Sequence, residues 1–153
     1  EIENIKKYVE MAKKELIERG VEFSEYVPLG IMIETPAAAL ISDELAKKVD
    51  FFSIGTNDLT QYTLAIDRQN CKVGNLIDKH HKSVLKLIKF VTESAHKNGI
   101  EVGICGELAS DESLTELFLS MGINELSVSP GAVLSLRKKV TEIDVSKYTD
   151  DFL

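Results

Sequence analysis

The sequence has no hydrophobic run that approaches the roughly 20 residues of a transmembrane helix, and nothing near its N-terminus resembles a signal peptide. It also has no block of basic residues, and its 153 residues carry a formal net charge of -7. A protein with this charge is poorly suited to bind nucleic acid or an anionic membrane surface. We therefore expect a cytoplasmic protein with no membrane insertion and no nucleic-acid partner.

Cysteine is scarce, with only Cys71 and Cys105 present. Two cysteines are too few for a disulfide scaffold, and these are too far apart for a zinc ribbon, although counting alone leaves a disulfide between them open. A reducing cytosol is the simpler expectation. The length and the ordinary composition, 44% hydrophobic and 28% charged, indicate a single globular domain spanning residues 1–153. Because the chain begins with Glu1 rather than Met, we expect it to be a piece of a larger protein.

Short apolar runs alternate with segments that have the spacing of amphipathic helices. The runs predict buried strands at residues 29–33, 51–54, 102–105 and 125–128. Helices are expected at residues 2–19, 37–48, 59–66, 83–98, 114–121 and 131–140. Residues 67–80 have no period and predict a long loop, a kind of segment that is usually functional or mobile in compact domains.

This alternation predicts an α/β fold with about four parallel strands joined by right-handed crossovers. Four units are half the number in a closed β/α barrel, which needs eight and typically about 250 residues. We therefore predict half of a (β/α)8 TIM barrel. The uncovered sheet edges of such a half-barrel favour pairing with a second copy, so a homodimer is expected.

Two acidic residues follow the ends of consecutive predicted strands, Glu34 after the first and Asp58 shortly after the second. Neighbouring strands lie about 4.8 Å apart, so both carboxylates can reach one cation. Two hard oxygen ligands, with water and substrate in the remaining positions, are typical of Mg²⁺ sites. Singly, each acid is equally well explained as a residue at a helix N-terminus. Together, at the same end of a sheet, they favour the metal.

Two further residues are candidates for chemistry. Cys105 ends the third predicted strand between two glycines, and the sequence leaves open whether it is a proton donor, a nucleophile or a core thiol. Arg68 lies in the long loop and can clamp a phosphate or carboxylate, or be an ordinary surface arginine. Nothing in the spacing of the three histidines assigns them a role: His80, His81 and His96.

Four segments together resemble a known family: residues 30–39 (Gly-Ile-Met-Ile-Glu-Thr-Pro-Ala-Ala-Ala), 50–63, 65–68 (Ala-Ile-Asp-Arg) and 103–109 (Gly-Ile-Cys-Gly-Glu-Leu-Ala). They are similar in order and spacing to the C-terminal phosphoenolpyruvate-binding domain of Enzyme I, the phosphoenolpyruvate-protein phosphotransferase of the bacterial sugar phosphotransferase system. The resemblance covers about residues 1–140. The Gly-Thr-Asn-Asp-Leu-Thr-Gln block within residues 50–63 is specific to phosphoenolpyruvate-utilising enzymes, and pyruvate phosphate dikinase and phosphoenolpyruvate synthase share much of it.

The resemblance implies that the chain is the second half of a phosphoenolpyruvate-binding β/α barrel, a fragment that lacks the earlier strands and the domain carrying the phosphorylated histidine. It implies Mg²⁺ as the cofactor, with Glu34 and Asp58 as its ligands. Asn57, Asp58 and Arg68 match the substrate-binding residues, and Cys105 matches the catalytic acid. Residues 78–82 depart from the family, which often has a proline-containing segment there.

The function implied is transfer of the phosphoryl group of phosphoenolpyruvate to a histidine of another domain, with release of pyruvate. That histidine would in turn phosphorylate a histidine-containing phosphocarrier protein. Free thiols are mostly protonated at neutral pH, so Cys105 can supply the proton that carbon 3 of enolpyruvate needs. The fragment alone is expected to be inactive. Two alternatives remain: the equivalent part of a dikinase or synthase, and a non-catalytic half-barrel module that self-associates.

Overall fold

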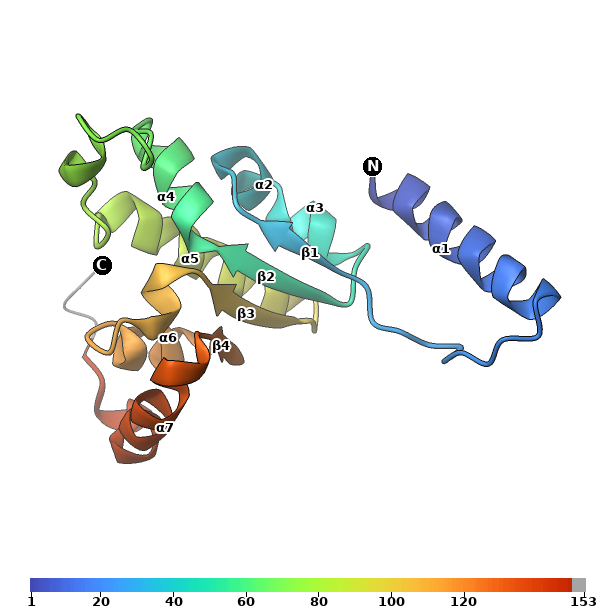
Figure 1. Ribbon diagram of the computed structural model, residues 1–153. Coiled ribbons are helices and arrows are strands. Elements are labelled where there is room, and N and C mark those ends of the chain that lie inside the picture. The colour runs from blue at the N-terminus through green and yellow to red at the C-terminus, as the bar shows by residue number, and fades with distance from the viewer. Residues whose placement is uncertain (150–153) are drawn as a thin grey trace.

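In the computed structural model, residues 1–149 are described, and they form an α/β fold around a four-stranded parallel sheet (Figure 1). The strands lie side by side in chain order: β1 (Gly30–Ile33), β2 (Phe51–Gly55), β3 (Glu101–Cys105) and β4 (Glu125–Ser127). The helices are α1 (Ile2–Glu18), α2 (Pro36–Leu40), α3 (Ser42–Ala46), α4 (Thr56–Leu64), α5 (Lys82–Lys97), α6 (Thr115–Met121) and α7 (Val133–Glu142). Four 3-10 turns complete the fold: η1 (Gly74–Leu76), η2 (Glu107–Ser110), η3 (Pro130–Ala132) and η4 (Val145–Lys147).

The core lies on one face of the sheet. Ile33, Ile54 and Ile104 are aligned across β1, β2 and β3, and all three are fully buried. Because alternate residues of a strand point to opposite faces, their row contacts the helices, among which α5 packs on the sheet between α3 and α6 (Figure 1). This apolar layer is what holds the strand ends, and any site on them, in fixed relative positions.

The opposite face of the sheet is open. Its middle row consists of Met32, Ser53, Gly103 and Glu125, none of which is buried. A parallel sheet normally has both faces covered, and in a closed β/α barrel this second face is the interior. Four parallel strands in chain order, with helices on one face, are the arrangement of a half-barrel. The fold class predicted from the sequence is confirmed.

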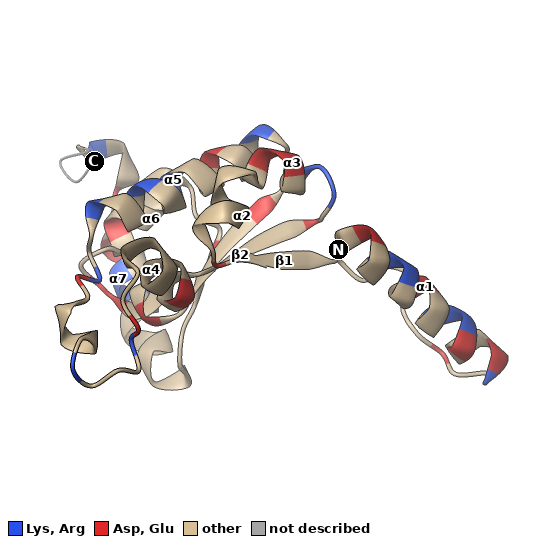
Figure 2. Ribbon diagram, turned by 90° about the horizontal axis from the view of Figure 1, so that it is seen from above, with Lys and Arg blue, Asp and Glu red and all other residues tan. Residues whose placement is uncertain are grey.

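Helix α1 carries its predicted apolar stripe without burying it. No residue of α1 is buried, and Ile17 is 66% exposed. The helix extends away from the body of the molecule (Figure 1), and acidic and basic residues alternate along it (Figure 2). Only its first turn meets the sheet layer, where Ile2 packs against the core. Among residues 1–149, no helix combines the length and apolar character that crossing a membrane requires.

Two helix predictions need correction. The helix expected at residues 37–48 is two short ones, α2 and α3, separated at Ile41, whose φ of -107° and ψ of 18° lie outside the helical range. This break lets both short helices pack on α5 with Ala39 and Ala46 buried. The helix expected at residues 59–66 begins earlier, at Thr56, so that β2 runs straight into α4.

Candidate active site

Three strand ends meet at the carboxyl edge of the sheet, on its open face. Glu34 follows β1 directly, and in the register of the sheet it is the neighbour of Gly55, which is paired with Cys105. A Cβ built on Gly55 would lie 2.8 Å from Oε2 of Glu34 and 3.0 Å from its Cβ. The glutamate therefore lies over the glycine, and the absence of a side chain at position 55 makes room for it.

Cys105 is a free, half-buried thiol next in this row. Its Sγ accepts a hydrogen bond from Oγ of Ser53 at 3.5 Å and donates one to the carbonyl of Ile54 at 3.6 Å. Since Ile104 points into the core, Cys105 points to the open face. This thiol is accessible from the side where a ligand at the strand ends would lie, which a core thiol would not be.

The start of α4 is tied to the end of β3. The buried hydroxyl of Thr56 donates to the carbonyl of Cys105 at 2.9 Å. Oδ1 of Asn57 accepts from the backbone N–H of Glu107 at 3.0 Å. These bonds fix Asn57 beside the segment that follows Cys105.

Gly106 allows this close approach, and we expect Gly106→Ala to destabilise the fold by about 2–4 kcal/mol. Its φ of 97° and ψ of -170° are accessible essentially only to glycine, and a Cβ would lie 2.6 Å from Oγ1 of Thr56. Gly99→Ala is the matched control, because Gly99 also has a positive φ, 72°, with nothing within 4 Å of its Cβ position. That change should cost about 1 kcal/mol. Denaturant unfolding measures both, and equal losses would show that the contact with Thr56 does not matter.

A cleft of about 410 Å³ opens beside the strand ends, and Asn57 and Arg68 both line it. Its floor is the start of α4, one wall is the loop between α4 and α5, and the other is η2. The lining residues are Thr56, Asn57, Thr60, Arg68, Gln69, Gly74, Ile77, Lys79, Glu107 and Leu108. The size suits a small ligand, and the lining contains two basic side chains, Arg68 and Lys79, and one acid, Glu107.

Each of the two basic side chains that line the cleft is paired with an acid. Nη2 of Arg68 lies 3.6 Å from Oδ1 of Asp58, and Nζ of Lys79 lies 2.5 Å from Oε2 of Glu107. The hydrogen bond from Lys79 and its positive charge lower the pKa of Glu107, with a smaller contribution from Arg68, against the opposing effect of partial burial. The side chains of both pairs are well exposed, so each pair contributes little to the stability of the fold. Its main effect is to keep its two side chains in position.

Comparison with known proteins shows the family of the chain. The family described as "PEP-utilising enzyme, PEP-binding domain" matches residues 1–145. The chain belongs to this family. It is 47% identical over its whole length to a phosphoenolpyruvate-protein phosphotransferase of Borreliella burgdorferi, covering 27% of that protein. Proteins of the same name from Haemophilus influenzae and Enterococcus faecalis are 48% and 46% identical over 94% and 90% of the chain, of which it covers 25% and 24%. The chain thus spans about a quarter of the length of the curated relatives it matches.

The structure divides the predicted site residues of this PEP-binding domain between two adjoining places. Asn57 and Arg68 line the cleft together, and Asp58 pairs with Arg68 from the first turn of α4. Glu34 and Cys105 lie on the open face at the strand ends. The bond between Asn57 and the backbone of Glu107 is where the two places meet.

The predicted metal site is composed of ligands that suit Mg²⁺, and it remains a prediction. Within residues 1–149 there is no cluster of three or more His, Cys, Asp or Glu side chains placed to hold a metal. A site with two protein carboxylates and water or substrate in the other positions needs no such cluster. Thr35, rather than Glu34, caps α2 through its side chain, accepting from the N–H of Ala38. The capping explanation for Glu34 is therefore removed, whereas Asp58 does lie in the first turn of α4.

Sequence reasoning missed three residues of the site. Glu107 carried the same signal as Glu34, an acid just after a strand end, and could have been found by it. Lys79 stood in an unpatterned loop and Thr56 in a polar turn, so neither had a local signal. Both acquire their positions from contacts with residues distant in sequence, Glu107 and Cys105.

Proposed function

We propose that this chain is the phosphoenolpyruvate- and Mg²⁺-binding part of a phosphoenolpyruvate-protein phosphotransferase. The names of its relatives support this activity over that of a dikinase or synthase. The observation that carries the proposal is that three features meet at one edge of the sheet. They are Glu34 over Gly55, the thiol of Cys105, and the cleft lined by Asn57 and Arg68.

Each residue has a role that its chemistry permits. Arg68 presents a planar fork for the phosphate or carboxylate of the substrate, and the side chain of Asn57 orients it from the floor of the cleft. Glu34 and Asp58 would hold Mg²⁺, which when bound supplies positive charge to the transferring phosphoryl group. Asp58 also keeps Arg68 in place through their ion pair.

Cys105 supplies the proton that completes the reaction. When the phosphoryl group passes to a histidine nitrogen of another domain, the bond between phosphorus and the enol oxygen breaks, its electron pair stays on the oxygen, and the enolate of pyruvate remains. Carbon 3 then takes the proton of the Cys105 thiol, giving pyruvate, and the thiolate regains a proton from water. The weak bonds of the Cys105 sulfur to Ser53 and Ile54 orient it without immobilising its proton.

The partners follow from the same proposal. The acceptor histidine belongs to another domain of the longer protein, which passes the phosphoryl group to a histidine-containing phosphocarrier protein, and the complex works in the cytoplasm. β1 and β4 have each only one strand neighbour within residues 1–149. These open edges support self-association into a homodimer. The proposal also treats residues 1–153 as one domain, the C-terminal half of a barrel.

Calorimetry on the complete protein tests the proposal. We expect phosphoenolpyruvate to bind in the presence of Mg²⁺ and to lose most of its affinity when Mg²⁺ is removed by a chelator, because the anion would face two uncompensated carboxylates. Sulfate at the same concentration serves as the control for general anion binding. Absence of phosphoenolpyruvate binding by the complete protein would overturn the proposed function.

A further inference from the structure

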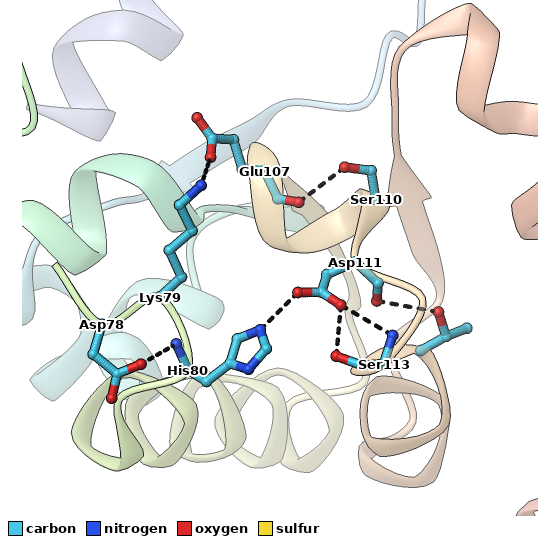
Figure 3. A network of polar contacts seen from close by, with 8 residues as sticks. Asp78, Lys79, His80, Glu107, Ser110, Asp111 and Ser113 are labelled. Carbon is cyan, nitrogen blue, oxygen red and sulfur yellow. Dashed lines mark hydrogen bonds and ion pairs between the residues drawn. The ribbon is translucent and has the colours of Figure 1, made fainter. Parts of the chain in front are cut away.

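We infer that Lys79 and His80 fasten the loop between α4 and α5, residues 65–81, onto the segment between β3 and α6, residues 106–114, and so position one wall of the cleft. We call this pair of contacts the loop latch. Lys79 contacts Glu107, and Nε2 of His80 lies 2.6 Å from Oδ2 of Asp111 (Figure 3). Two neighbouring residues of the loop thus meet two acids of a segment some thirty positions further along the chain.

The loop side of the latch is ordered by local hydrogen bonds. Oδ1 of Asp78 accepts from the backbone N–H of His80 at 2.9 Å, closing a turn that turns both latch side chains toward η2 (Figure 3). Directly after it, Nδ1 of His81 accepts from the backbone N–H of Ser83 at 3.3 Å and caps α5. The latch residues are therefore held between a turn and a capped helix rather than in free chain.

The receiving side is ordered as well, because the two oxygens of Asp111 have separate tasks. Oδ1 accepts from the backbone N–H and the hydroxyl of Ser113, at 3.0 and 2.6 Å, which leaves Oδ2 directed at His80. The carbonyl of Glu107 accepts from Oγ of Ser110 at 2.9 Å. The carboxylate of Asp111 and the backbone of Glu107 are thus held by bonds within their own segment (Figure 3).

The latch spans the cleft, so it bears on ligand binding. Lys79 lines the cleft from the loop and Glu107 lines it from η2, and their contact ties these two parts of the lining together. The same loop carries Arg68, whose N–H donates to Oε1 of Gln61 at 3.1 Å and anchors the loop at its start. Because the loop is anchored at its start by Gln61 and at its end by the latch, the wall that carries Arg68 is held in one position. His80 makes its contact outside the set of residues that line the cleft, so it acts only through the loop.

Both contacts are exposed, with the side chains of Lys79 and His80 62% and 43% accessible. Pairs of this kind are individually weak. The latch therefore governs the opening of the loop and contributes little to the stability of the fold.

Amide hydrogen exchange on the complete protein without ligand tests the latch. We expect Lys79→Ala and His80→Ala each to speed exchange in residues 66–80 by about two- to fivefold, and the double variant to exceed either. Exchange in β3 and the second half of α5 should stay as in the wild type. A variant with the two charges exchanged, Lys79→Glu together with Glu107→Lys, should recover much of the protection that Lys79→Ala loses. Lys72→Ala is the control, because Lys72 is an exposed lysine of the same loop with no ion pair among the residues described.

Two results would overturn the inference. One is unchanged loop exchange in the double variant. The other is a rise that extends equally to β3 and α5, since this would indicate a general loss of stability rather than an opening loop.

Acid should release the latch. Hydrogen bonding and charge from Lys79 lower the pKa of Glu107. Partial burial acts to raise the pKa of Asp111, but hydrogen bonds from Ser113 and His80 together outweigh it and lower that pKa. The groups facing these acids are Lys79, Arg68 and His80, with Asp78 next to them on the loop. When folding lowers the pKa of a carboxyl group, the contacts of its charged form stabilise the folded arrangement above the ordinary carboxyl pKa. That stabilisation is lost as the pH falls through the lowered pKa. The difference in loop exchange between wild type and double variant should therefore begin to shrink as the pH falls below about 4 and go on shrinking as the pH falls through the lowered pKa values. A difference that does not shrink there would contradict the assignment.

A binding measurement extends the test to the ligand, and this arm rests on the proposed function. We expect His80→Ala to raise the dissociation constant of phosphoenolpyruvate with Mg²⁺ about two- to fivefold, although His80 does not line the cleft, and Lys72→Ala to leave it unchanged. Unchanged affinity for His80→Ala alongside faster loop exchange would overturn the positioning role. Absence of binding by the wild type would instead count against the proposed function and leave the exchange result standing.

Discussion

Glu34→Gln and Asp58→Asn are each expected to lower the rate of phosphoryl transfer from phosphoenolpyruvate by at least about a hundredfold in the complete protein. Both changes keep the shape of the side chain and remove its charge. A neutral amide is a poor ligand for Mg²⁺, and loss of one electrostatic contact that stabilises developing charge typically costs a factor of about 10² to 10³ in rate. The loss should be partly recovered at high Mg²⁺ concentration, because metal affinity is what the variants lack.

Appearance of the phosphohistidine form under single-turnover conditions measures this step directly. Glu44→Gln is the matched control, since Glu44 is an exposed acid of α3 and lies away from the carboxyl edge of the sheet. Asp58→Asn has a second effect, the loss of its ion pair with Arg68 at 3.6 Å. The two variants should therefore differ in their affinity for phosphoenolpyruvate, with Asp58→Asn the weaker. Normal phosphoryl transfer by Glu34→Gln would show that Glu34 and Asp58 do not share an ion.

Cys105→Ala is expected to slow pyruvate formation by about a hundredfold or more while leaving phosphoenolpyruvate affinity within about twofold. General acid catalysis by one positioned group contributes a factor of about 10² to 10⁴. The half-buried sulfur makes only two weak hydrogen bonds, so its removal leaves the strand ends in place. Phosphohistidine should still form in a single turnover, whereas release of pyruvate lags behind it.

Cys71→Ala separates this effect from a general need for thiols, because Cys71 is exposed in the loop and should tolerate the change. Cys105→Ser is the more informative companion. It keeps a polar group of similar size at the same position, but a hydroxyl is a much weaker acid than a thiol, so it should behave like the alanine variant. Wild-type rates of pyruvate release by either Cys105 variant would remove this residue from the mechanism.

Part of the fold could be read from local pattern. The apolar runs that became β1 to β4 were found because a strand of a parallel sheet is buried and short, and helix α5 because its apolar residues recur at helical spacing. The order of these elements then required parallel pairing, which the structure confirms. The family was also evident, since the glycine, asparagine and aspartate of residues 55–58 belong to a block that resembles phosphoenolpyruvate-utilising enzymes.

The misses share a cause, which is that long-range contacts overrode local sequence. Thr56 to Asp58 look like a turn, yet they begin a helix because Thr56 bonds the last carbonyl of β3. Residues 37–48 look like one helix, yet they divide because both halves must pack on α5. The apolar stripe of α1 was predicted correctly, but its exposure depends on what surrounds it and has no signal in its own residues.

The sequence by itself determined the alternation of strands and helices, the family and which residue types stand at the strand ends, because each of these depends on neighbours within a few positions. Only the tertiary structure decided that Glu34 lies over Gly55, that Asn57 and Arg68 line one cleft, and that Lys79 and His80 reach Glu107 and Asp111. The physical reason is separation along the chain: these partners are 11 to 31 residues apart, and register and loop geometry bring them together rather than any local preference.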